Sequence, residues 1–397
     1  MKIMSGLAAA AACLSLPAAC SDGEPPAAAP ARSASAPATP APSETITPSK
    51  RWRDLFGAVE LKGASGLVDV LAKGPKDAWA AGFEDGAEDE YGVPVLAHWS
   101  GSAWTRVPVE NSDLRVRAFD VAGRDDIWLV GGSGVVSHWD GRVWTEQRPF
   151  GVAEDYWPND VAAAKGHAVI VGSSAGGGFG LEWDGTKFEL IQQVDGVFTS
   201  VALDDGHVWA VGSRPHGGCQ DVKPTVAHRS PDEGWLYDQD MSLPDIPGGH
   251  LHSVLAIKPD DVWVAGAVGG DDRYEDLPAR CAPPSEDKIA AETPEPLVMH
   301  WNGSAWRRME LPPWKGSLRH LTAFGKDDVW ASGTDPLHPG RAILLHYDGT
   351  SWTREAISAG RTGNAAIAAV PGTSDLWGVG SIGEGTDYEQ PFIVKRH

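Results

Sequence analysis

Five histidines are the first candidates for chemistry, because each stands directly before the same position of a recurring motif. Zinc sites place imidazole nitrogens at about 2.0–2.1 Å from the metal and need several such ligands close together. These histidines occupy equivalent positions in successive repeats, so an arrangement of the repeats around an axis keeps them apart. We interpret them as hydrogen-bond partners within each repeat, and we expect neither a metal site nor a cofactor. The five are His98, His138, His228, His300 and His346.

Two further patterns resemble catalytic groups. Paired acids at Asp125–Asp126, Asp260–Asp261 and Asp327–Asp328 could act as acid and base, but they recur at one position of the repeat. We interpret them as turn residues that accept hydrogen bonds from local backbone N–H groups. Residues 172–176 match Gly-x-Ser-x-Gly around Ser174. The hydrolase turn with this pattern leads into a helix, and no helical pattern follows here. We therefore expect no catalytic residue from either pattern.

The elements that position these residues form a repeat of short strands. Each unit has an apolar strand, a turn, a strand ending in Trp-x-x-Gly, a variable loop, a third strand, a tight turn and a further Trp. The glycines lie 49, 41, 40, 54, 67 and 47 residues apart, and such periods are typical of propeller blades. The seven glycines are Gly82, Gly131, Gly172, Gly212, Gly266, Gly333 and Gly380. The tryptophan is Trp79, Trp128, Trp209, Trp263, Trp330 or Trp377, and Val169 replaces it in the third unit.

The two ends of the repeat region complement each other. The last unit ends at His397 after a third strand (Phe392–Arg396), before any fourth-strand Trp. A matching residue, Trp52, follows the Pro-rich segment at the other end. A strand around Trp52 would complete the last blade and remove the exposed edges of the ring. The sequence thus predicts an all-β fold over residues 50–397, a seven-bladed β-propeller of four-stranded antiparallel blades that is closed by this N-terminal strand.

The connection between the third and fourth strands carries a repeated turn signal. A residue tolerant of tight turns is followed by Gly in five units, and this pairing favours a two-residue hairpin turn with positive φ. The pairs are Ser100-Gly101, Asp140-Gly141, Asp184-Gly185, Asn302-Gly303 and Asp348-Gly349.

The repeat resembles a known family. Asp260-Asp261-Val262-Trp263, with Gly266 after it, and His138-Trp139-Asp140-Gly141, with Trp144 after it, look like the Trp-rich repeats of secreted bacterial proteins related to kelch and galactose-oxidase propellers. The resemblance covers residues 50–397. Kelch blades carry a Gly pair after the second strand, and here only Gly131-Gly132 does so. The resemblance implies a fold but no activity, because that superfamily includes both enzymes and binding proteins.

The first 49 residues predict export and a tether. Residues 1–19 resemble a signal peptide, with Lys2 before an apolar stretch, Ile3–Leu16, that is too short to span a bilayer as a permanent helix. The small residues before Cys20 resemble a bacterial lipobox, although Leu16 lies four residues before the cysteine instead of three. We expect lipidation of Cys20 and a place in the bacterial cell envelope, as an outer-membrane lipoprotein. Cleavage by an ordinary signal peptidase is the alternative. Residues 20–49, rich in Pro, Ala and Ser, predict a disordered tether.

Two cysteines follow the N-terminal region, Cys219 and Cys281. Both lie in loops between second and third strands, in the fourth and fifth blades, so they share one face of adjacent blades. Because export permits disulfides, we expect a bond that fastens the long insertion at residues 267–296 to its neighbour. Two free thiols are the alternative.

Candidate ligand-binding residues lie where the repeat is interrupted. Loops between second and third strands and loops between blades share one rim, and exposed aromatic side chains around a shallow mouth suit a small ligand, a glycan or a protein loop. Alternatively, Trp157 and Trp314 cap the central core. Acidic loops at Glu84–Glu90 and Asp271–Asp276 could bind Ca²⁺, but we interpret them as solvated. The candidates are Trp157, Trp314, Tyr156, His250, His252, Arg319 and His320.

Charge narrows the class of partner. The net charge is −21 and the pI is about 4.9, so the surface repels phosphate backbones and nucleic acid is not expected. The sequence predicts a monomeric, exported, membrane-tethered propeller that acts as a non-catalytic binding module for a glycan or an envelope protein. The alternative is a glycan hydrolase or lyase on the same rim, which would need two carboxylates in a cleft.

Overall fold

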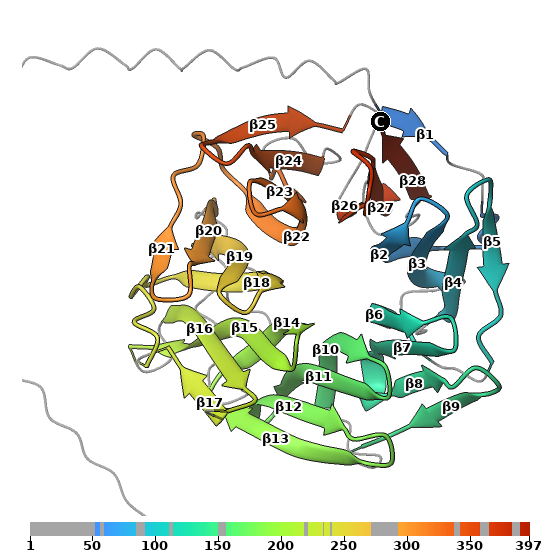
Figure 1. Ribbon diagram of the computed structural model, residues 1–397, viewed down its shortest axis with the longest axis horizontal. Helices are drawn as coiled ribbons and strands as arrows, with labels where there is room; N and C mark the ends of the chain where they lie inside the picture. Colours follow the sequence, from blue (N-terminus) through green and yellow to red (C-terminus); the bar gives the residue numbers. More distant parts are fainter. Residues whose placement is uncertain are drawn as a thin grey trace, which may run out of the picture. The chain divides into compact units, whose positions relative to one another are not determined.

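The described residues between 52 and 397 form seven antiparallel sheets around a central axis (Figure 1). The computed structural model describes residues 52–55, 59–84, 92–110, 114–149, 156–217, 221–232, 234–238, 240–270, 293–336, 342–357, 365–382 and 390–397. Within these segments the one helix is a single 3-10 turn, η1 (Gly132–Gly134). None of their helices is long and apolar enough to cross a bilayer.

Each sheet is a blade of four strands (Figure 1). Six blades are formed by four consecutive strands, and the first of the four is innermost. In the seventh blade the last three strands of the chain are joined by its N-terminal strand, which is outermost. Blade 1 contains β2 (Gly66–Gly74), β3 (Asp77–Glu84), β4 (Val93–Trp99) and β5 (Trp104–Val107). Blade 2 contains β6 (Val116–Gly123), β7 (Asp126–Gly131), β8 (Val136–Trp139) and β9 (Trp144–Gln147). Blade 3 contains β10 (Tyr156–Ala164), β11 (His167–Ser174), β12 (Gly177–Trp183) and β13 (Phe188–Val194). Blade 4 contains β14 (Val197–Asp204), β15 (His207–His216), β16 (Asp221–Ser230) and β17 (Gly234–Tyr237). Blade 5 contains β18 (Gly249–Lys258), β19 (Asp261–Val268), β20 (Glu295–Trp301) and β21 (Trp306–Arg308). Blade 6 contains β22 (Ser317–Gly325), β23 (Asp328–Thr334), β24 (Ala342–Tyr347) and β25 (Trp352–Ala356). Blade 7 contains β26 (Ala365–Ala369), β27 (Leu376–Ile382), β28 (Gln390–Arg396) and β1 (Trp52–Asp54).

The closing strand lies where the sequence predicts it. β1 pairs antiparallel with β28, with Trp52 opposite Arg396, and the N–H of Leu55 continues the ladder to the carbonyl of Ile393 at 2.8 Å. Trp52 is buried against Ile357 and other apolar residues of blades 6 and 7. The seven-bladed fold class is therefore confirmed, including its closure by the N-terminal strand.

The apolar core consists of separate clusters at the interfaces between blades. Each of the seven apolar clusters that the described residues form joins two neighbouring blades, and the cluster of blades 7 and 1 completes the ring. The second-strand tryptophans lie in these interfaces; Trp128 and Trp209, for example, are fully buried. Burial of such large apolar surfaces stabilises the packing of blade against blade.

The histidines have the structural role predicted for them. In four blades a second-strand Asp carboxylate accepts the indole N–H of Trp at 2.8–3.2 Å and lies 2.7–2.9 Å from the His Nε2. The centroids of the His and Trp rings are 3.8–4.3 Å apart. In blade 4 the Asp is replaced by His207, whose Nδ1 lies 3.0 Å from Nε2 of His228. Burial lowers the pKa of His228 to about 4. The four groups are Asp77–Trp79–His98, Asp126–Trp128–His138, Asp261–Trp263–His300 and Asp328–Trp330–His346.

Two predictions about turns need correction. The paired acids do more than satisfy local backbone donors, because the second Asp of each pair binds the Trp and His side chains of its blade. The third and fourth strands are joined by four residues instead of two, since Trp139 pairs with Trp144. The carboxylate of Asp140 accepts the N–H groups of Arg142 and Val143, both at 2.9 Å, and Gly141 has the expected positive φ of 86°.

Candidate functional site

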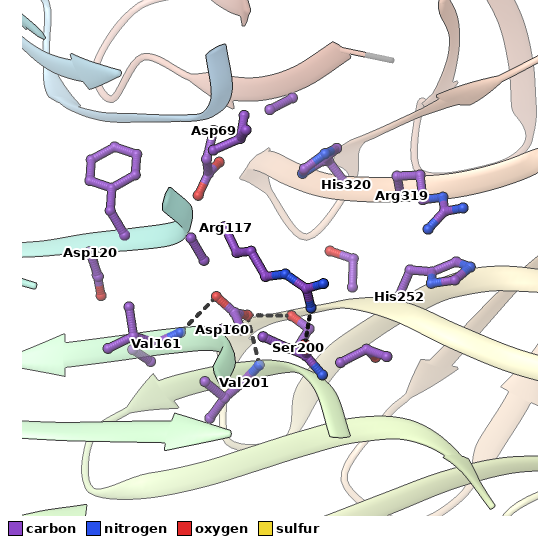
Figure 2. A pocket seen from close by; sticks show the side chains of 18 of the residues that line it. Asp69, Arg117, Asp120, Asp160, Val161, Ser200, Val201, His252, Arg319 and His320 are labelled. Carbon is purple, nitrogen blue, oxygen red and sulfur yellow. Dashed lines mark hydrogen bonds between the residues drawn. The ribbon is translucent and has the colours of Figure 1, made fainter. Parts of the chain in front are cut away.

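A cavity of about 1860 Å³ runs along the inner strands of the blades (Figure 2). Its lining includes residues of β2, β6, β10, β14, β18, β22 and β26. The inner strands begin at the end where the loops between second and third strands lie, because Leu67 at the start of β2 pairs with Gly82 near the end of β3. We call this end of the cavity the mouth, and define it by Arg115, Trp157 and the bulged residues described next.

A β-bulge recurs near the start of the inner strand in six blades. The bulged residues are Val68, Arg117, Asn159, Thr199, His252 and Arg319, and all six line the cavity. A bulge places one extra residue in a strand and turns its side chain away from the regular alternation. The inner strands therefore present a ring of mostly polar side chains at the mouth.

The recurring glycine is explained by the same geometry. A Cβ atom on Gly131 would lie 1.9 Å from the carbonyl oxygen of Arg115, directly before the bulge of β6. The equivalent distance is 2.0–2.1 Å at Gly82, Gly172, Gly212, Gly266 and Gly333. Only glycine permits this approach of the two backbones. The Trp-x-x-Gly motif and the ring of bulged residues thus depend on each other.

Three aspartates line the cavity beyond the bulges, and Figure 2 shows them on neighbouring blades. Each accepts the N–H of the next residue in its own strand at 2.7–2.8 Å. Two of them also bind the following blade. Asp120 accepts the N–H of Ala163 at 2.7 Å, and Asp160 accepts the N–H of Val201 at 2.9 Å. Within the described residues, the backbone N–H bound by Asp69 is that of Val70 in its own strand.

Hydroxyl groups continue this connection around the ring. The Oγ of Ser200 accepts the N–H of Val254, and the Oγ of Ser253 accepts that of Leu321. Thr322 accepts the N–H of Ala369 in blade 7 at 2.9 Å. These bonds lie on inner strands and each joins one blade to the next, so the acids and hydroxyls together stabilise the ring from within.

Burial controls protonation inside the cavity. It raises the pKa of Asp160 to about 6 and raises that of Asp120, which the positive charge of Lys73 at 4.0 Å partly opposes. The pKa of Asp69 is raised well above its ordinary value by burial and by the negative charge of Asp160. Burial lowers the pKa of His320 to about 4. The deep part of the cavity therefore favours neutral forms of these groups.

Five of the seven predicted ligand-binding residues line this cavity: Trp157, His250, His252, Arg319 and His320. Trp157 is 37% exposed. Tyr156 packs on Phe179 with ring centroids 5.6 Å apart. Trp314 lies in the interface of blades 5 and 6, with the guanidinium of Arg354 5.7 Å from its ring. The structure therefore separates Tyr156 and Trp314 from the other five.

Other predicted features are placed as follows. Ser174 lies in the β11–β12 hairpin, where its Oγ donates to the carbonyl of Gly177 at 2.8 Å. The acidic loop Glu84–Glu90 is interpreted from the sequence as solvated, which is wrong for its first residue, because Glu84 is buried and accepts a hydrogen bond from the guanidinium of Arg106 at 2.9 Å. Residues 85–90 of this loop lie outside the described residues. The signal peptide, Cys20, the tether, Cys219, Cys281 and residues 271–276 lie outside the described residues. Across the described segments, no three His, Cys, Asp or Glu side chains are grouped as metal ligands.

The sequence reasoning missed the three aspartates and Arg117. A signal for the acids was present, because Asp69-Val70, Asp120-Val121 and Asp160-Val161 each place a charge inside an apolar inner strand of three successive blades. No sequence signal marked Arg117, since its exposure depends on the bulge.

Comparison with known proteins supports the fold. A structure of YCF48 bound to D1 peptide is 15% identical, covers 89% of this chain and 98% of its own, and has a TM-score of 0.51. The structure of U3-55K is 11% identical, with coverages of 88% and 99% and a TM-score of 0.56. Hydrazine synthase from Kuenenia stuttgartiensis is 12% identical, with coverages of 81% and 93% and a TM-score of 0.54. No protein-family model and no curated protein matches the chain.

These likenesses show a β-propeller and no more, because identities of 11–15% carry no activity from one protein to another. The kinship with kelch and galactose-oxidase propellers remains a prediction.

Proposed function

We propose that this protein is a non-catalytic binding module that holds a segment of a protein partner at the mouth of its central cavity. The observation that carries the proposal is the exposed Trp157 beside the polar ring of bulged residues, on a scaffold braced from blade to blade. Exposed aromatic side chains on rigid elements are typical anchors of protein interfaces. One similar propeller, YCF48, was solved with a bound peptide, which is consistent with this use of the fold.

The arrangement of carboxylates favours binding over catalysis. A glycan hydrolase needs two carboxyl groups free to act on one bond. Of the three cavity acids, Asp120 and Asp160 have both oxygens occupied by backbone N–H groups of two blades. Their first role is to hold blades together, which leaves Asp69 as the acid with a single backbone bond.

A glycan hydrolase or lyase remains the second candidate, favoured by the raised pKa of the cavity acids. Its test is release of reducing or unsaturated ends from a panel of envelope polysaccharides by the wild type and by Asp69→Asn. The binding proposal predicts no release by either protein. Release that Asp69→Asn abolishes would establish an enzyme.

Location belongs to the proposal as well. We propose that the chain is exported and anchored through a lipidated Cys20, with residues 20–49 as a tether. Metabolic labelling with an alkyne fatty acid tests this. Label on the wild type and none on Cys20→Ser is the expected result, whereas an unlabelled, freely soluble wild type would contradict the anchor.

The binding role is tested by measuring affinity for a partner purified from envelope extracts. Trp157→Ala should weaken binding at least tenfold, because it removes an exposed anchor without touching the core. The matched control is Val143→Ala, which changes a side chain that is 50% exposed in the β8–β9 turn of blade 2 and does not line the cavity. Binding that Trp157→Ala leaves unchanged would refute the assignment to the mouth. A purified polysaccharide that binds in place of protein would refute the partner class.

A further inference from the structure

The mouth carries positive charge on a strongly negative chain. The whole sequence has 33 Lys and Arg against 54 Asp and Glu. The cavity lining reverses this balance, with five basic side chains and three acidic ones. The basic residues are Lys73, Arg115, Arg117, Arg148 and Arg319. Because burial raises the pKa of all three acids, they offset the arginines less than their number suggests.

Two of these arginines lie together in blade 2. Arg115 and Arg117 are exposed and flank the buried Val116 at the start of β6. The structure gives neither guanidinium a carboxylate partner within 4.0 Å among the described residues. Arg148, by contrast, forms an ion pair with Glu146 at 3.0 Å. Arg115 and Arg117 therefore present two exposed charges at the edge of the mouth.

Neighbouring blades fix where these charges lie. The guanidinium of Arg115 packs over the ring of Phe83 in blade 1, 4.5 Å from its centroid. Arg117 donates to the amide oxygen of Asn159 at 2.8 Å, and the amide nitrogen of Asn159 donates to the carbonyl of Phe198 in blade 4 at 2.9 Å. This chain of contacts joins blades 1 to 4. It holds the arginines in place before a ligand binds, which lowers the entropy cost of binding.

We infer that the partner segment is an extended acidic peptide whose two carboxylate side chains, two residues apart, bind Arg115 and Arg117 while a flanking apolar residue contacts Trp157. The inference rests on the proposed function and names its partner class. Residues two apart in an extended strand face one side, so two carboxylates of one extended segment can face the start of β6 together, one for each arginine. A single terminal carboxylate would match one of them. Arginine is well suited to carboxylates because its planar fork donates two parallel hydrogen bonds.

The probe is a random nonapeptide display library. Selected peptides that are then synthesised have amidated ends. Selection on the wild-type propeller should enrich peptides that carry Asp or Glu at two positions two residues apart. Selection on the double variant Arg115→Gln/Arg117→Gln should lose that enrichment. Fluorescence anisotropy on the leading peptide should then show at least a tenfold loss of affinity for either Glu→Gln peptide, for Arg115→Gln and for Arg117→Gln.

The matched control is Arg142→Gln, which makes the same change at an exposed residue of the β8–β9 turn in the same blade. It should leave affinity within twofold. A neutral or basic consensus would overturn the inference, as would an acidic consensus that persists in the double variant. Selection of peptides that need Trp157 but no acid would leave the proposed function standing. Partner affinity that Trp157→Ala leaves unchanged would refute the proposed function itself.

Discussion

The closing strand offers the most quantitative test of the fold. Trp52 is 7% exposed and packs against Ile357 and Phe392 in the cluster that joins blades 6 and 7. Truncation of a buried Trp to Ala leaves a cavity and costs about 3–5 kcal/mol. Because β1 is held by few backbone bonds besides this side chain, we expect Trp52→Ala to release the strand. The free energy of unfolding should fall by about 4 kcal/mol.

Urea unfolding followed by circular dichroism measures this change, with Trp157→Ala as the control. Trp157 is 37% exposed and lies outside the apolar clusters, so its truncation should cost no more than about 1 kcal/mol. The Trp52→Ala protein should also associate with itself, because the freed edge of β28 can pair with another chain. Equal and small losses in the two variants would refute the view that β1 closes the ring.

Three further predictions follow from individual contacts. Asp126→Asn should destabilise the protein by about 2–3 kcal/mol and Asp328→Asn by less, since Asp126 also binds blade 3 and is better buried; thermal unfolding distinguishes them, and equal losses would contradict the blade-to-blade role. Burial raises the pKa of Asp160 from 3.8 to about 6, so the folded chain holds this proton more tightly than the unfolded chain. The stabilising contribution of protonated Asp160 is complete below about pH 4 and falls as the pH rises through about 6. The stability of the wild type relative to Asp160→Asn should therefore fall by up to about 3 kcal/mol between pH 4 and 7, and a difference independent of pH would contradict this. Gly131→Ala should unfold or strongly destabilise the protein, whereas Gly74→Ala, whose added Cβ would have no atom within 4 Å, should be neutral; similar melting temperatures would refute the close approach of the two strands.

Much of the fold was predictable because it repeats. The spacing of the Trp-x-x-Gly glycines fixed the number of blades, and the unmatched ends at Trp52 and His397 indicated how the ring closes. The histidines were correctly interpreted as structural, since equivalent positions in a repeat have equivalent surroundings. The turns were less predictable, because Asp140-Gly141 is compatible with hairpin loops of two or four residues.

The site was predictable only in part. Breaks in the repeat pointed to Trp157, His252 and Arg319, which line the cavity. The same reasoning could not separate them from Trp314, because exposure at a rim depends on how neighbouring blades pack. The bulge that turns Arg117 toward the cavity depends on the pairing of two strands, and strand register is not encoded by any short motif.

Site-specific photo-cross-linking in the native cells tests the central claim most directly. A benzoylphenylalanine at position 157 lies at the mouth, and one at position 143 lies in an exposed turn of blade 2 that does not line the cavity. We predict cross-links from position 157 to an acidic segment of one protein partner, and none to that partner from position 143. Cross-links to that partner from position 143 alone, or from both positions equally, would contradict binding at the mouth.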